Sequence, residues 1–166
     1  MRLGATRADN VYRIGSILRH GGAVSYGTDW PAANYYSTFR PLDAIEIATT
    51  RQELPQLGPV AEAISLDDAL KASTMGPAYQ LGMEREVGSI EVGKLADMVV
   101  LERNLFDVES DQIHKTNVLM TVMNGQVRHG QVSRLCEHDA NYPLRSLCQA
   151  LPSISPLPAD LSRLMR

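Results

Sequence analysis

The chain has 166 residues, which is enough to bury one ordinary hydrophobic core or to be one piece of a larger protein, and its 44% hydrophobic and 21% charged residues are typical of a globular protein. Its net charge of −3 and its lack of a basic tract argue against nucleic acid as a partner. We expect no membrane association, because no apolar run approaches the roughly 20 residues of a membrane-spanning helix and the N-terminus lacks the apolar segment of a secretory signal.

The first predicted element is a helix over residues 10–20, where apolar side chains recur at helical spacing and Asp9 can cap the start. Gly21 and Gly22 end this helix. The apolar run 23–26 follows at once and is predicted to be a short strand. A helix joined to a strand by a short connection is typical of an α/β protein with a parallel sheet.

Further helices are predicted before residue 83. Pro41 is well placed to start a helix that continues toward Arg51. Ser65 and Asp68 resemble a capping box, with Asp in place of the usual Glu or Gln, and predict a helix over 66–73. The pair Leu81-Gly82 closes this helical region.

The residue pattern of the second half of the chain predicts β-strands and turns. Glycines bound a predicted turn or short hairpin over 88–94, and the apolar runs 98–101 and 118–123 are predicted strands. Asn124-Gly125 joins the second of these to residues 126–128, and this dipeptide is a strong hairpin signal.

Prolines accumulate from residue 133 onward and periodicity fades, so we expect a poorly ordered tail over 133–166. The two cysteines of the chain, Cys136 and Cys148, lie in this tail without metal-motif spacing. Two cysteines cannot form a disulfide framework, which favours a reducing, cytoplasmic setting.

Three segments, in this order, resemble the C-terminal part of the metal-dependent amidohydrolase superfamily, in the branch called amidohydrolase family 3. Residues 27–31, Gly-Thr-Asp-Trp-Pro, are similar to the G-[ST]-D-W-P motif at the end of the last barrel strand of that branch. Residues 69–82 resemble its following helix pair. Residues 88–101 match its G-S-I-x-x-G-K-x-A-D-x-V-x-L signature almost position for position. The resemblance covers roughly residues 1–131.

This resemblance implies an α/β fold, namely a C-terminal fragment of a TIM-type (β/α)8 barrel plus part of a flanking β-sandwich. Residues 1–85 would hold the last barrel strand and its flanking helices, and residues 86–132 would form the return into the β-sandwich. A complete barrel of this kind takes roughly 250 residues, so this chain is expected to contain only its final part.

The resemblance also implies a function, which is hydrolysis of a non-peptide carbon–nitrogen bond in a small molecule by metal-activated water. The family's catalytic aspartate at the end of the last strand corresponds to Asp29, which the resemblance makes both the catalytic residue and a metal ligand. A divalent metal lowers the pKa of bound water, and a nearby carboxylate can carry the proton. Zinc is the metal expected in full-length relatives.

The family's metal-binding histidines have no counterparts, because the four histidines of the chain lie elsewhere. His20 is at a helix end, and the other three, His114, His129 and His138, lie in the β region and the tail. We therefore expect this chain alone to be inactive and not to bind metal tightly. The alternative hypothesis is a non-catalytic truncated product that needs a partner to complete the barrel, with self-association through an open barrel edge.

Four other residues have a functional and a structural interpretation. Arg13 and Arg51 flank the presumed mouth of the site, where they either bind a substrate carboxylate or are simply exposed helical arginines. Trp30 is expected in a packed, rigid loop, with substrate contact as the second possibility. His20 near a helix C-terminus is expected to interact with the helix dipole rather than to ligate a metal.

Overall fold

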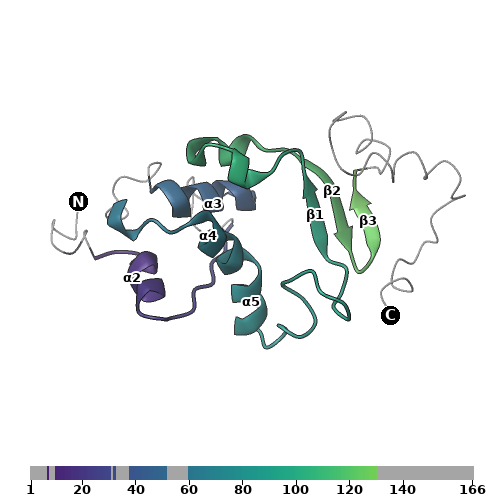
Figure 1. Ribbon diagram of the computed structural model, residues 1–166, viewed down its shortest axis with the longest axis horizontal. Helices are drawn as coiled ribbons and strands as arrows, with labels where there is room; N and C mark the ends of the chain where they lie inside the picture. The colour runs from purple at the N-terminus through teal and green to yellow at the C-terminus, as the bar shows by residue number, and fades with distance from the viewer. Residues whose placement is uncertain (1–6, 8–9, 31, 33–37, 52–59, 131–166) are drawn as a thin grey trace, which may run out of the picture. The chain divides into compact units, whose positions relative to one another are not determined.

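The computed structural model describes residues 7, 10–30, 32, 38–51 and 60–130, which form two compact units (Figure 1). The first unit contains the described residues up to Met83 together with Leu105–Thr116, and is helical. The second contains Glu84–Asn104 and the described residues from Asn117 onward, and holds a small sheet. The predicted tail over 133–166 lies outside the described residues. In the part of the chain that the structure describes, no helix is long and apolar enough to cross a membrane.

The first helix, α2, covers Ile14–Arg19 and is shorter than predicted. Tyr12 has a left-handed backbone with φ of 53°, which an α-helix cannot contain, so the helix begins after it. Arg13 occupies the N-cap position without a side-chain cap, and Asp9, the predicted cap, lies outside the described residues. Gly21, with φ of 76°, follows the helix and confirms the predicted stop.

The predicted strand over 23–26 is wrong, because this segment is irregular in the structure. A strand exists only through a ladder of backbone hydrogen bonds to a neighbouring strand. Here the amide of Tyr26 instead donates to the carbonyl of Ala72, 3.2 Å away in helix α4 (Leu66–Ser73). An apolar run predicts that a segment is buried, but the partner decides which backbone structure it adopts.

Helices α3 and α4 confirm the predictions, and the end of α5 confirms that Leu81-Gly82 closes the helical region. Helix α3 covers Pro41–Thr50, with proline in its first turn, and Ser65 caps α4 because its Oγ accepts a hydrogen bond from the Asp68 amide at 3.1 Å. Helix α5 covers Met75–Gln80 and is followed by Gly82, whose φ is 70°. These ends are coded by local residues, which is why the sequence predicts them well.

The core of the first unit lies where α3 packs on α4 and on the short 3-10 helix η4 (Ser110–Lys115). Four of its eight buried apolar side chains are alanines, and the other four are isoleucines or a leucine. A buried carboxylate fastens η4 to α3, because Glu46 Oε2 accepts hydrogen bonds from the His114 amide at 2.9 Å and from its ring Nδ1 at 2.6 Å. The buried apolar residues of this unit are Ile45, Ala48, Ile64, Ala69, Ala72, Ala78, Leu105 and Ile113.

The second unit contains a three-stranded antiparallel sheet in the order β1-β2-β3. Its strands are β1 (Met98–Leu101), β2 (Val118–Met123) and β3 (Gln126–His129), which confirms the predicted runs. Asn124 and Gly125 connect β2 to β3 with φ of 49° and 72°. Two consecutive left-handed residues are the requirement of a type I′ hairpin turn, so the Asn-Gly signal is confirmed.

Candidate functional site

Asp29, the residue to which the sequence assigns the chemistry, lies in an exposed turn after the irregular segment 23–28. Its backbone is left-handed, with φ of 55°, a conformation that few non-glycine residues adopt and that Asp and Asn tolerate best. The amide of Ala32 donates to the Asp29 carbonyl at 2.7 Å and closes the turn. The carboxylate is therefore presented to solvent on a backbone of defined shape.

Tyr26 anchors the segment that leads to this turn. Its hydroxyl donates to the Ala69 carbonyl at 3.0 Å and lies 2.8 Å from the Ser73 hydroxyl, so the side chain is tied to α4. Burial raises the pKa of the Tyr26 phenol, and the hydrogen bond with Ser73 partly offsets this rise. Tyr26 thus acts as a neutral hydrogen-bonding anchor three residues before Asp29.

Helix α5 supports the same segment through a close backbone approach. A Cβ atom added at Gly76 would lie 2.4 Å from the Val24 carbonyl oxygen and 3.2 Å from Ser25 Cα. Such a contact is too short for any side chain, so the packing of segment 23–26 on α5 requires glycine at this position. The Ser25 hydroxyl also donates to Gln80 Oε1 on α5.

The residue after Asp29 is an exposed aromatic. Trp30 is 59% exposed and packs edge-to-face against Phe39, with ring centroids 6.3 Å apart and an interplanar angle of 77°. The expected packed loop is therefore wrong for this side chain. It keeps most of its surface in solvent, with Phe39 as its ring contact.

The part of the chain that the structure describes includes Asp29, His20, His114 and His129. Among these residues no group of three or more His, Cys, Asp or Glu side chains is arranged to hold a metal ion. Asp29 offers one carboxylate, whereas a catalytic zinc takes three protein ligands. The described residues therefore do not by themselves fit a metal centre. His138 lies outside the described part of the chain.

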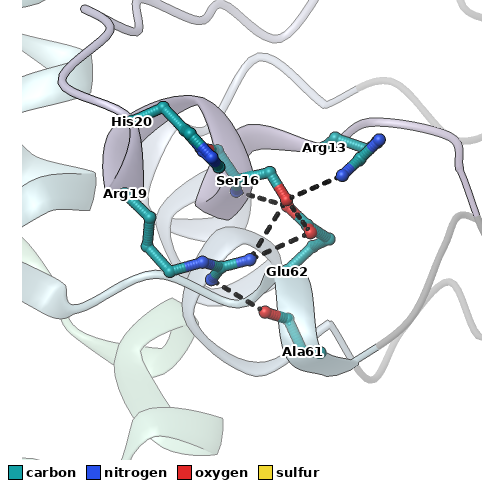
Figure 2. Close-up of polar contacts among 6 residues, drawn as sticks. All are labelled: Arg13, Ser16, Arg19, His20, Ala61 and Glu62. Atoms are coloured by element: carbon teal, nitrogen blue, oxygen red, sulfur yellow. Dashed lines mark hydrogen bonds and ion pairs between the residues drawn. The ribbon is translucent and has the colours of Figure 1, made fainter.

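The other candidates from the sequence have structural partners. Arg51 ends α3 in a left-handed conformation and is only 8% exposed, so its interpretation as an exposed arginine is wrong. Arg13 Nη2 lies 3.4 Å from the Ser16 hydroxyl. His20 Nδ1 hydrogen-bonds the Ser16 carbonyl at 2.7 Å, which fits its predicted place at the end of a helix (Figure 2).

A buried carboxylate that sequence reasoning missed joins α2 to the 3-10 helix η2 (Val60–Glu62). Glu62 is 5% exposed and accepts hydrogen bonds from the Ser16 amide at 2.6 Å and the Ser16 hydroxyl at 2.5 Å. Arg19 Nη2 lies 3.1 Å from the same carboxylate (Figure 2). We call Ser16, Arg19 and Glu62 the Glu62 clamp. Nothing local in the sequence marks it, because Ser16 and Glu62 are 46 residues apart.

The hydrogen bond from the Ser16 hydroxyl is the main reason that the pKa of Glu62 lies below its ordinary value. The Ser16 amide and the charges of Arg19 and Arg13 lower the pKa further, while burial opposes them. A carboxyl whose pKa is lower in the folded state stabilises the fold above its unfolded pKa, near 4.5. This stabilisation disappears as the pH falls through the folded value.

Glu62→Gln is therefore expected to lower the urea midpoint at pH 7. The difference in midpoint between parent and variant should shrink as the pH falls below about 4.5. Circular dichroism at 222 nm, measured in urea from pH 7 to pH 3, would follow this change. Glu109→Gln replaces an exposed glutamate and should leave the midpoint nearly unchanged. A deficit of the same size at every pH would show that the Glu62 charge does not stabilise the fold.

The sequence of this chain is similar to those of known proteins. The family model described as "Amidohydrolase family" matches residues 1–129. The N-substituted formamide deformylase of Arthrobacter pascens is 32% identical over 121 residues, which are 72% of this chain and 21% of that enzyme. A 5-methylthioadenosine/S-adenosylhomocysteine deaminase of Caldanaerobacter subterraneus is 32% identical over 119 residues, which are 72% of this chain and 25% of that protein.

A solved adenosine deaminase from Xanthomonas campestris with bound zinc has the same fold over part of its length. It aligns with a TM-score of 0.55 and 21% identity, covering 85% of this chain and 32% of that structure. The likeness supports the predicted α/β fold class. The chain belongs to the amidohydrolase family, and it spans about a fifth to a quarter of the length of the two curated relatives.

Proposed function

We propose that this chain supplies the catalytic aspartate, Asp29, of an amidohydrolase that hydrolyses a carbon–nitrogen bond in a small molecule. The observation that carries the proposal is the exposed Asp29 carboxylate on a left-handed turn, in a segment anchored by α4 and α5. Family membership supports it, because the relatives include a deformylase and a deaminase.

The proposed role of Asp29 is proton transfer. The carboxylate accepts a proton from the attacking water and delivers it to the departing nitrogen, so that an amine or ammonia leaves in its neutral form. Solvent exposure lets a substrate reach the carboxylate. The anchoring of Tyr26 and the approach of Gly76 limit the movement of the loop, and positioning of a proton-transfer group is a large part of its effect.

We propose zinc as the metal of the full-length relatives, with Asp29 as one of its ligands, and the zinc-bound deaminase supports this choice. Because the described residues do not form a metal centre, we expect this chain alone to retain little metal. We further propose that residues 1–85 form the end of a (β/α)8 barrel and that 86–132 belong to the flanking β-sandwich.

A chimera with the formamide deformylase tests the proposal. The 121 residues of this chain that match the deformylase replace their counterparts in that enzyme. We expect the chimera to bind zinc and to release formate from an N-substituted formamide, whereas the deformylase lacking this stretch is inactive. Zinc content by mass spectrometry and formate release are the measurements. A folded, zinc-loaded chimera without hydrolysis would contradict the proposal.

A further inference from the structure

Glu46 and His114 form a carboxylate–histidine pair within the first unit. Glu46 is 4% exposed, and its Oε2 atom accepts hydrogen bonds from the His114 amide at 2.9 Å and from the ring nitrogen Nδ1 at 2.6 Å. The guanidinium of Arg40 donates to the His114 carbonyl at 2.5 Å. His114 is thus held at its amide, its carbonyl and its ring, so its imidazole has a fixed orientation.

The hydrogen bond to Glu46 assigns the proton of the neutral imidazole to Nδ1. An ionised carboxylate only accepts hydrogen bonds, so the ring nitrogen that faces it carries the hydrogen. The other nitrogen, Nε2, then has an unshared electron pair. A carboxylate behind Nδ1 also makes the ring more basic, and an adjacent group of this kind is how proteins activate a nucleophile.

The ring edge that carries Nε2 faces away from Glu46. The His114 side chain is 33% exposed, whereas that of Glu46 is 6% exposed, so the Nδ1 edge is covered and the opposite edge is open. None of the hydrogen bonds formed by the described residues uses Nε2. A contact that only fastens η4 to α3 needs Nδ1 alone. The pair therefore presents a nitrogen with an electron pair to solvent.

We infer that His114 is a nucleophilic site, which accepts an acyl group on Nε2 from an activated acyl donor such as an ester or anhydride with a good leaving group. The Nε2 electron pair forms a bond to the carbonyl carbon. The bond from that carbon to the leaving group breaks, and the leaving group departs with its electron pair. The Nδ1 proton passes through Glu46 to solvent, so the acylated ring is neutral. Water then hydrolyses the acyl–imidazole bond, which releases the acid and restores the ring.

Diethyl pyrocarbonate, an anhydride that carbethoxylates neutral imidazole, is the probe, applied to the purified 166-residue chain at pH 7. Peptide mass spectrometry measures the rate at each histidine. His20 is the matched control, because its Nδ1 also makes a hydrogen bond, but to the neutral carbonyl of Ser16 at 2.7 Å. We expect His114 to react about tenfold faster than His20, the lower end of the effect of a carboxylate behind a functional histidine. His20 is the more exposed of the two. Exposure alone therefore predicts the opposite order, and that order, or equal rates, would overturn the inference.

Glu46→Gln removes the charge with little change in size and should lower the rate at His114 about tenfold, with the rate at His20 unchanged. Glu109→Gln, at the exposed glutamate before η4, should change neither rate. Circular dichroism at 222 nm checks the fold of both variants. A folded Glu46→Gln protein that reacts at the parent rate would contradict the inference. If this variant does not fold, the order of the two rates in the parent chain decides, because that comparison needs no substitution.

The inference is independent of the proposed function, because the reaction at His114 does not use Asp29. Asp29→Asn should leave the rate at His114 unchanged. An inactive deformylase chimera would therefore refute the role of Asp29 without affecting the reactivity of His114, and a slow reaction at His114 would leave the role of Asp29 intact.

Discussion

Replacing Asp29 with asparagine in the deformylase chimera is expected to lower kcat by about 10²–10⁴-fold, the usual contribution of a positioned proton-transfer group. Asparagine has the size of aspartate and tolerates the left-handed backbone that Asp29 adopts, with φ of 55°. The substitution therefore removes the proton acceptor without disturbing the turn. The effect should fall mainly on kcat, because the carboxylate acts on the reacting atoms rather than on substrate binding.

The measurement is formate release under saturating substrate, compared between the chimera and its variants. Asp111→Asn, at an exposed aspartate of η4, is the matched control and should retain the parent rate within about twofold. Zinc content measured in the same samples separates lost chemistry from lost metal. If Asp29→Asn turned over substrate at the parent rate, Asp29 would have no catalytic role.

Gly76→Ala is expected to destabilise the first unit by about 1–3 kcal/mol, the usual cost of overpacking. In an ordinary helix this change would stabilise the protein by about 0.5–1 kcal/mol, because glycine is a poor helix former. Here the new Cβ would lie 2.4 Å from the Val24 carbonyl oxygen, which is backbone and cannot rotate away. The clash outweighs the helix propensity and reverses the sign of the effect.

Urea unfolding followed by circular dichroism measures the loss, and hydrogen exchange of the Tyr26 amide locates it. This amide donates to Ala72, so its exchange should quicken when segment 23–26 is pushed away from α5. Gly27→Ala is the matched control, because a Cβ there meets nothing within 4 Å and should change stability by less than about 1 kcal/mol. A Gly76→Ala protein as stable as the parent would refute the close packing.

Elements whose ends depend on residues close in the sequence were predictable from the sequence. Pro41 at the start of α3, Ser65 at the cap of α4 and Asn124-Gly125 in the hairpin each act within a few residues. The structure confirms all three. The predicted strand over 23–26 failed because a strand also depends on a partner far away in the sequence. The predicted helix over 10–20 was too long because the left-handed Tyr12 leaves no signal in the hydrophobic pattern.

The candidate site, too, was predictable only in part from the sequence. The sequence alone identified the family, which the comparison confirms, and selected Asp29 as the residue to test. It did not predict the anchors of that residue, because Tyr26 meets Ala69 across 43 positions. The same holds for the Glu62 clamp, and for the pair of Glu46 with His114 across 68 positions.

The sequence by itself determined the family, the helix caps, the hairpin and the identity of the candidate catalytic carboxylate. The tertiary structure alone decided how the segment before that carboxylate is anchored and which glycine must stay small. The physical reason is the separation along the sequence of the residues that interact. Backbone conformation at a cap or turn depends on neighbouring residues, whereas hydrogen bonds and close contacts between distant segments exist only after the chain has folded.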